Sequence, residues 1–227
     1  MQRPSTRLEH DPSLNHPLRS GWAWWFAAIV VFLGLASVAL SPTWIQSLTQ
    51  IEKPLLLAIH QHENSLFNAI AIGLSVVGGL PVMACMVFLV ASREFILHET
   101  ARGWIIVGGF TGATLTGWAM KWAVARPRPA IWSSKVAQFG DSFPSGHSIY
   151  AMAFALILIM INWRSPFRYV WILLGLGWAM LMAFSRMYLG VHYPSDVVGG
   201  ISLAVIWMLG LSLWHQHGVV WCNSSRS

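Results

Sequence analysis

Three short polar clusters between residues 121 and 196 contain the side chains of this sequence that are best suited to chemistry. They are Lys121 with Arg128-Pro129, then Pro144-Ser145-Gly146-His147, then Ser185-Arg186 with His192 and Asp196. Together they supply cations, imidazoles and a carboxylate at the edges of long apolar runs. Such side chains can bind a phosphate group and attack its phosphorus. We therefore expect the three clusters to meet in one anion-binding pocket.

The first cluster could hold phosphate oxygens. Lys121 and Arg128 are about two helical turns apart, and the prolines on either side of Arg128 indicate that the chain leaves the helix there. Arginine offers a planar fork to two oxygens, whereas lysine acts as a point charge. The alternative is a basic anchor at the membrane edge, and we assign Arg126 and Lys135 to that role.

The second cluster has the features of an anion site at a helix N-terminus. Ser145 is a favourable N-cap, and the free N–H groups of the first turn, with Gly146 beside them, can bind an anion. His147 follows at a position from which it could protonate a leaving oxygen as a general acid. An ordinary cap followed by an interfacial histidine would also explain these residues.

The third cluster pairs a histidine with a carboxylate. His192 and Asp196 are four residues apart, so on a helix that begins at Pro194 the carboxylate can reach one imidazole nitrogen. That hydrogen bond would fix the tautomer and leave the other nitrogen free to attack. Alternatively, Asp196 only compensates the helix dipole and Arg186 is a second basic anchor at the membrane surface.

The composition of the chain is that of a membrane protein. Of its 227 residues, 56% are hydrophobic and only 10% are charged, whereas a soluble domain carries about 25% charged residues. The two cysteines do not indicate a disulfide framework, and we expect no nucleic-acid partner. The alternating histidine pairs at 60/62 and 215/217 have no third ligand nearby, so we expect no metal site.

Six apolar segments are long enough to cross a bilayer, which takes about 20 residues. They are 22–40, 66–91, 104–122, 147–163, 169–185 and 194–214. We predict an all-α membrane bundle of six transmembrane helices over 22–214, with a flexible cytoplasmic tail at 1–21 and a short one at 215–227. Gly78-Gly79 and Pro81 predict a kink in the second span rather than a break. The segment 42–64 could be an amphipathic helix along the interface or a plain loop.

The basic residues between the spans predict the orientation. With both termini in the cytoplasm, eight basic residues lie inside and six outside, and three of those six belong to the clusters. This distribution satisfies the positive-inside rule and places all three clusters on the outer face. The compact chain suits a bacterial inner membrane, with the site on the periplasmic side.

The spacings K-x6-RP, PSGH and SR-x5-H-x3-D give the chain a family resemblance. It resembles the type 2 phosphatidic acid phosphatases, which are integral-membrane lipid phosphatases related to bacterial acid phosphatases and vanadium haloperoxidases. The resemblance implies that His192 forms a phosphohistidine, that Asp196 orients it, and that His147 acts first as general acid and then as base. It implies that the phosphate is bound by Lys121, Arg128, Ser145, Gly146 and Arg186. It also implies a reaction without a metal or another cofactor.

The leading hypothesis is therefore a phosphatase acting on a membrane lipid phosphate or diphosphate. The candidate substrates are undecaprenyl diphosphate, phosphatidylglycerophosphate, phosphatidic acid, diacylglycerol diphosphate and the lipid A 1-phosphate, with an isoprenoid diphosphate placed first on family habits. One alternative is a lipid phosphotransferase that uses the same intermediate. Another is a non-enzymatic transporter or sensor of lipid head groups. Haloperoxidase chemistry fits a bilayer scaffold less well. The sequence indicates no oligomeric state.

Overall fold

The computed structural model describes residues 16–224, and the regular structure within that range is entirely helical. These residues form the eight helices α1 (His16–Leu40), α2 (Pro42–His60), α3 (Ser65–Val77), α4 (Leu80–Ile96), α5 (Thr100–Val124), α6 (Gly146–Ile161), α7 (Arg168–Tyr188) and α8 (Pro194–Ser224). The all-α prediction is confirmed. Residues 1–15 of the predicted N-terminal tail and 225–227 of the predicted C-terminal tail lie outside the described range. Helix α8 continues past residue 214, where the last span was expected to end.

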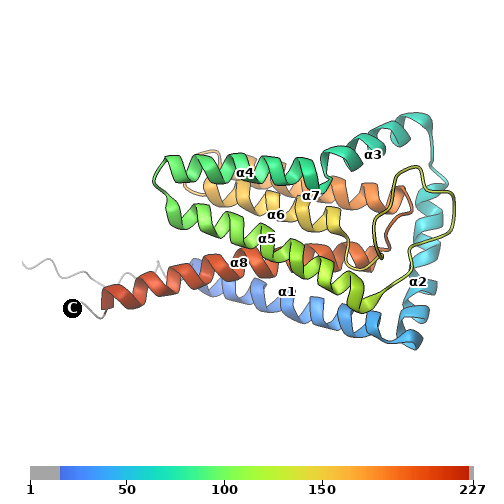
Figure 1. Cartoon of the computed structure of the whole chain (residues 1–227), viewed down its shortest axis with the longest axis horizontal. Coiled ribbons are helices and arrows are strands. Elements are labelled where there is room, and N and C mark those ends of the chain that lie inside the picture. Colours follow the sequence, from blue (N-terminus) through green and yellow to red (C-terminus); the bar gives the residue numbers. More distant parts are fainter. Residues whose placement is uncertain (1–15, 225–227) are drawn as a thin grey trace, which may run out of the picture.

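Most of the helices run side by side along one direction, with α8 at the centre of the packing (Figure 1). Helix α8 contacts α1, α5, α6 and α7, and α6 also packs against α5 and α7. Buried apolar side chains such as Ile106, Phe110, Ile149, Leu203 and Met208 fill the space between them. Burial of apolar area against neighbouring helices holds such a bundle in one arrangement.

Within the described part of the chain, three helices are long and apolar enough to cross a membrane, over Gly21–Leu40, Arg168–Tyr188 and Pro194–Gln216. Helices α3 and α4 meet the same criterion only as a pair bent by 53°, and α6 is apolar but shorter. The described residues thus contain up to four spans by length and composition. The six-span layout and the position of the termini stay predictions.

The second predicted span is broken rather than kinked, so that part of the prediction is wrong. Helix α3 ends at Val77 and α4 begins at Leu80, with a 53° change of direction between them. The N–H of Gly78 closes the last turn of α3 by donating to the carbonyl of Leu74. Pro81 lies in the first turn of α4, where its missing N–H costs nothing. The glycines and the proline together therefore end one helix and start another.

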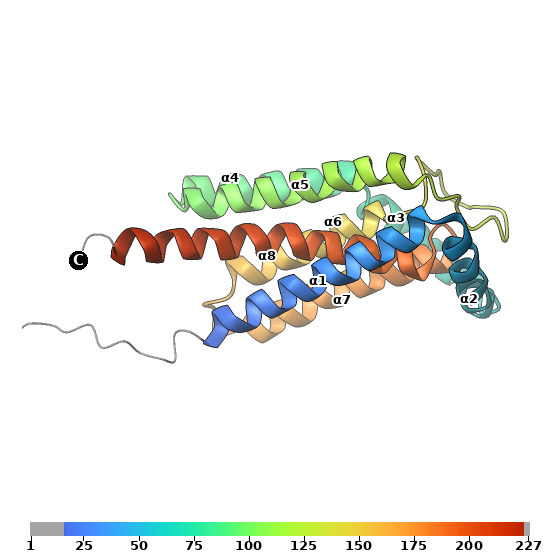
Figure 2. The ribbon, with the colours of Figure 1, turned by 90° about the horizontal axis from the view of Figure 1, so that it is seen from below.

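Helix α2 resolves the two alternatives for residues 42–64 in favour of a helix. It lies across one end of the bundle and does not follow the direction of the long helices (Figures 1 and 2). Ser41, in extended conformation, and Pro42 in the first turn set its start. The same end of the bundle carries the long connection from α5 to α6 and the short link from α7 to α8 (Figure 1).

A backbone hydrogen bond joins the end of the α5–α6 connection to the start of α8, since the N–H of Ser145 donates to the carbonyl of Asp196 over 2.9 Å. Within the α5–α6 connection, the N–H of Ser142 donates to the carbonyl of Arg126 over 2.8 Å. In the α7–α8 link, Gly190 adopts a left-handed backbone with φ +65°, and a Cβ there would lie 2.4 Å from the Trp132 ring. Only glycine allows this close approach without strain. The polar residues on both connections are thereby held together.

Candidate active site

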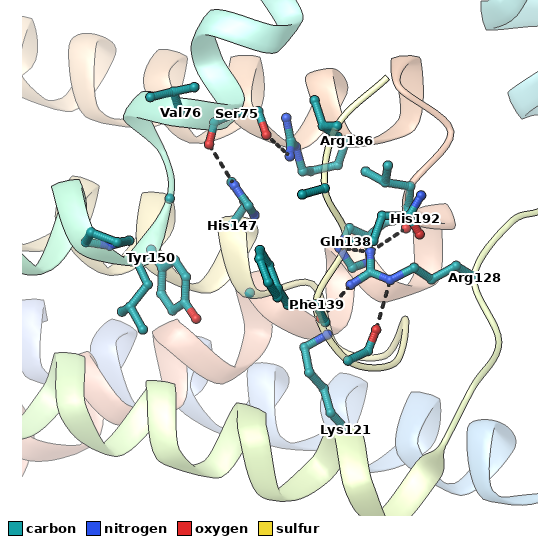
Figure 3. Close-up of a pocket in the computed structure, with 18 of the residues that line it drawn as sticks. Ser75, Val76, Lys121, Arg128, Gln138, Phe139, His147, Tyr150, Arg186 and His192 are labelled. Carbon is teal, nitrogen blue, oxygen red and sulfur yellow. Dashed lines mark hydrogen bonds between the residues drawn. The ribbon is translucent and has the colours of Figure 1, made fainter. Parts of the chain in front are cut away.

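A cavity of about 820 Å³ opens at this end of the bundle, between α3, α4, α5, α6 and the two connections. One part of its wall is polar and contains the cations Lys121, Arg128 and Arg186 and the imidazoles of His147 and His192, which come from five separate segments (Figure 3). Lys135 also lines the cavity. The rest is largely apolar and includes Ile72, Val76, Leu80, Trp118 and Trp122. The cavity thus has a cationic region that could bind an anion on one side and an apolar wall on the other.

Six of the eight predicted site residues line this cavity: Lys121, Arg128, Gly146, His147, Arg186 and His192. Asp196 lies behind His192, where it is fully buried. Ser145 is also fully buried and does not line the cavity in the described part of the chain. The residues of the three sequence clusters therefore converge on one place, although Lys121 and Asp196 are 75 positions apart in the sequence.

His192 lies in the α7–α8 link and turns its Nε2 toward the cavity. That nitrogen is 3.2 Å from an N–H of Arg128, which makes it the acceptor and places the ring proton on Nδ1. Nδ1 lies 3.6 Å from Oδ2 of Asp196, and among the described residues it has no hydrogen-bond partner at shorter range. The geometry fits a nitrogen with a free lone pair on the cavity side.

The protonation state of His192 can be tested directly. Burial lowers the pKa of His192 to about 3, against an opposing effect of Asp196 and with a further lowering by Arg128. A lowered histidine pKa means that the neutral imidazole persists until the solution becomes strongly acidic. We expect no titration of this ring between about pH 5 and 8, the range in which an ordinary histidine changes charge. NMR of ¹³C-histidine-labelled protein, with His192→Ala used to assign the signal, measures this. A midpoint near neutrality would contradict the buried neutral state.

The guanidinium of Arg128 has an acceptor for each of its five N–H groups. They donate to the carbonyls of Phe139, Gly140, Asp141 and Val191 and to Nε2 of His192. Burial lowers the pKa of Arg128, but an arginine stays charged in proteins. An incoming phosphate would replace some of these carbonyls, because its oxygens are the stronger acceptors.

Lys121 and Arg186 approach the cavity from the last turns of their helices. The Nζ of Lys121 donates to the carbonyl of Asp141 over 2.5 Å, beside the segment that contacts Arg128. Arg186 is only 1% exposed and donates to Oγ of Ser75 over 2.9 Å. A basic anchor at the membrane surface would be exposed, so that alternative is wrong for Arg186.

His147 lies in the first turn of α6 on the other side of the cavity from His192 (Figure 3). Its Nε2 donates to the backbone carbonyl of Ser75 over 3.0 Å. Ser75 therefore holds both this imidazole and Arg186, although it comes from α3 and belongs to none of the three clusters. A polar residue one turn before the Gly78-Gly79 break was the only signal for it in the sequence.

Ser145 differs from its expected role. It precedes α6 as the N-cap residue, but among the described atoms its hydroxyl makes no capping hydrogen bond and instead accepts one from Ser148 over 3.0 Å. Gly146 occupies the cavity wall in its place, and a Cβ there would lie 3.1 Å from the Tyr150 hydroxyl. The N-terminus of α6 thus presents its glycine rather than its serine hydroxyl.

Arg126 was assigned to a membrane-edge anchor, and this prediction is wrong. It is only 2% exposed, and it donates to Oδ1 of Asp196 over 2.6 Å and to Oε2 of Glu52 over 2.8 Å. In the sequence, the feature that could have indicated a buried Arg126 was Glu52. A carboxylate within an apolar stretch needs a partner of opposite charge if it is buried. Lys135, which was assigned in the same way, forms an ion pair with Glu63.

Among residues 21–216, whose side chains the structure describes, no group of three or more histidine, cysteine, aspartate or glutamate side chains could hold a metal ion. The groups in the cavity wall that can bind an anion are the N-terminus of α6 and the cations named above. The arrangement can therefore hold a phosphoryl group between two imidazoles, of which His192 directs its acceptor nitrogen Nε2 into the cavity.

Comparison with known proteins gives consistent matches. The model of the PAP2 superfamily matches residues 102–219. Phosphatidylglycerophosphatase B of Bacillus subtilis is 29% identical over 145 residues, which are 61% of this chain and 70% of that protein. The undecaprenyl-diphosphatase of Sulfolobus acidocaldarius is 30% identical over 138 residues, covering 58% of this chain and 57% of that protein.

Two solved structures share the fold. The crystal structure of a transmembrane PAP2-type phosphatidylglycerolphosphate phosphatase from Bacillus subtilis matches with a TM-score of 0.75 and 22% identity, over 85% of this chain and 96% of that one. The crystal structure of LpxE from Aquifex aeolicus matches with a TM-score of 0.58 and 21% identity, over 71% of this chain and 94% of that one. At this level of identity the likeness concerns the helical arrangement.

Proposed function

We infer that this chain, which belongs to the PAP2 superfamily, is a multi-pass membrane phosphatase that removes a phosphoryl group from a membrane lipid. One observation carries the proposal: Lys121, Arg128 and Arg186 meet the imidazoles of His147 and His192, all from separate segments, in a single cavity whose other wall is apolar. A lipid phosphate has the matching chemistry, with an anionic head and a hydrocarbon body. Relatives named phosphatidylglycerophosphatase and undecaprenyl-diphosphatase support both a phosphomonoester and a diphosphate as substrate classes.

In the proposed first step, Lys121, Arg128 and Arg186 bind the non-bridging oxygens. Nε2 of His192 attacks phosphorus, the bond from phosphorus to the leaving oxygen breaks, and His147 gives that oxygen a proton. The Nδ1–H of His192 points to Asp196, whose charge stabilises the positive ring that forms. The product is a phosphohistidine and a free alcohol or lipid phosphate.

In the second step, water attacks the phosphohistidine. His147, now neutral, accepts a proton from that water, the phosphorus–nitrogen bond breaks, and inorganic phosphate leaves. His192 returns to its neutral form and His147 to its protonated form. Charges that are already in place around the phosphoryl oxygens lower both barriers, because they do not need to reorganise as negative charge develops.

The apolar wall of the cavity supports a lipid rather than a soluble substrate. Trp122 and Val76 line the cavity and are 80% and 66% exposed, so the wall continues onto the outer surface of the bundle. In a bilayer that surface faces hydrocarbon. A lipid could therefore place its head group among the cations while its chain stays in the membrane.

A panel of lipids tests the activity and the substrate together. Purified protein in detergent with EDTA is incubated with phosphatidylglycerophosphate, undecaprenyl diphosphate, phosphatidic acid, diacylglycerol diphosphate and the lipid A 1-phosphate, and released phosphate is measured. We expect release from at least one lipid despite the chelator. No release from any of them, or transfer of the phosphate to another lipid in place of its release, would contradict hydrolysis.

We propose six spans formed by α1, the bent α3–α4 pair, α5, α6, α7 and α8, with α2 along the outer surface of a bacterial inner membrane. This arrangement places the cavity on the periplasmic side. Ser134 is exposed in the α5–α6 connection and provides a test. In a variant without Cys85 and Cys222, Ser134→Cys should react with an impermeant maleimide in intact spheroplasts. Reaction only after permeabilisation would reverse the orientation.

A further inference from the structure

A chain of buried charges connects α2 to the back of the His192 imidazole. Oε2 of Glu52 accepts from Arg126 over 2.8 Å, and Oε1 accepts from the backbone N–H of Ser195 over 2.6 Å. Arg126 in turn donates to Oδ1 of Asp196 over 2.6 Å and to the hydroxyl of Ser195 over 2.7 Å. Glu52 lies outside the stretch that matches the family model, which begins at residue 102.

Neither Arg126 nor Glu52 is placed to touch a substrate. Both are buried, and neither lines the cavity as the described residues form it. Four of the five N–H groups of Arg126 are engaged by Thr49, Glu52, Ser195 and Asp196. The Tyr193 ring packs on the guanidinium at 4.0 Å from its centroid. Arg126 is thereby fixed in position. Its remaining N–H, on Nε, has no partner among the described residues, but it is buried away from the cavity.

The two carboxylate oxygens of Asp196 have different hydrogen-bond partners. Arg126 holds Oδ1, while Oδ2 accepts from the Ser142 hydroxyl and the Tyr193 N–H and faces Nδ1 of His192. With Oδ1 fixed, the carboxylate cannot rotate away from the imidazole. Glu52 supplies a second negative charge on the far side of Arg126, so the guanidinium does not neutralise Asp196 alone.

We propose that Glu52 and Arg126 are positioning residues of the reaction, which hold Asp196 and through it keep His192 aimed at phosphorus. The proposal rests on the proposed function. It makes α2 part of the catalytic apparatus, since the helix that crosses the end of the bundle contributes the last member of the charge chain (Figure 1). Two buried carboxylates around one buried guanidinium would otherwise be an unfavourable way to attach a helix, because the desolvation of each charge opposes folding.

The chain offers a matched control in another buried ion cluster. Glu94 is fully buried and pairs with Arg93 and Arg102 near the end of α4, far along the helix from the cavity residues Leu80 and Pro81. Its charge and burial resemble those of Glu52, but it has no contact with a site residue. A structural effect of losing a buried carboxylate should therefore appear equally in Glu94→Gln and Glu52→Gln.

The test compares the binding of orthovanadate and inorganic phosphate by calorimetry, using the full chain in detergent. Vanadate can bond to the attacking nitrogen in the five-coordinate geometry of phosphoryl transfer, whereas phosphate reports only ground-state binding. For Glu52→Gln and Arg126→Lys we expect vanadate affinity to fall by about 10²-fold, since small displacements of a reacting group have effects of that order. Phosphate affinity and KM should stay within about threefold, and kcat should fall in parallel with vanadate affinity.

The ratio of the two affinities does not depend on the fraction of folded protein. An unchanged ratio in Glu52→Gln, with a lower melting temperature like that of Glu94→Gln, would overturn the proposal even if Arg126→Lys failed to fold. If the unmodified chain binds vanadate but hydrolyses no lipid, the proposed function fails. The ratio of vanadate affinity to phosphate affinity still decides whether Glu52 and Arg126 position His192. If the unmodified chain binds no vanadate, both fail.

Discussion

His192→Ala is expected to lower kcat by at least about 10⁴-fold, because it removes the atom that bonds to phosphorus. The imidazole is almost completely buried, and its Nε2 is the only nitrogen of the ring that faces the cavity. His147, the proposed general acid, cannot replace it, since His147 lies across the cavity and its Nε2 is engaged by the Ser75 carbonyl. Steady-state hydrolysis of the best lipid from the panel measures the effect.

The same variant should bind inorganic phosphate nearly as well as the unmodified chain. Lys121, Arg128 and Arg186 remain, and Arg128 gains a free N–H when its contact with Nε2 is removed. Retained binding together with lost turnover would separate a nucleophile from a structural residue. Activity within about tenfold of the original would show that His192 is not the attacking group.

Asp196→Asn is expected to lower kcat by about 10³- to 10⁴-fold with little change in KM, the size of effect known for an isosteric change of an aspartate that orients a catalytic histidine. Asparagine keeps the shape but removes the charge that stabilises the positive imidazole after attack. It also disturbs Oδ2, which accepts from the Tyr193 N–H and the Ser142 hydroxyl. An amide group turned to that side would present N–H groups to donors and favour the wrong imidazole tautomer.

The control for Asp196→Asn is the melting temperature measured beside that of Glu94→Gln. Arg126 keeps Glu52 as a partner after the change, so we expect the folded bundle to persist. A loss of activity that followed only the loss of folded protein would contradict the orienting role. A large rise in KM with unchanged kcat would also contradict it, because Asp196 does not line the cavity among the residues described.

The sequence was enough to predict that the three clusters meet at one site, but not which contacts their side chains make there. The three clusters stood out because charged residues are costly inside a membrane and these occur at the ends of apolar runs. Their spacing was enough to place His147, Arg128 and His192 around one cavity. The helical class was predictable for the same reason, since apolar runs of this length leave few alternatives.

The contacts that the sequence did not reveal are those between segments far apart in the chain. Glu52, one of the partners of Arg126, is 74 residues away in α2, and Ser75 holds His147 from 72 residues away. Local patterns carry no information about such pairs, and an arginine beside two prolines also fits an exposed anchor. The break at Gly78-Gly79 was visible as a weak point, but its 53° angle depends on packing that the sequence does not show.

The steric course at phosphorus tests the central claim most directly. A lipid thiophosphate that is chiral at phosphorus is hydrolysed in isotopically labelled water, and the configuration of the released thiophosphate is determined. Attack by His192 followed by attack of water consists of two in-line displacements, so the account predicts overall retention. Inversion would mean that water attacks the substrate in a single step, and His192 would not be the nucleophile.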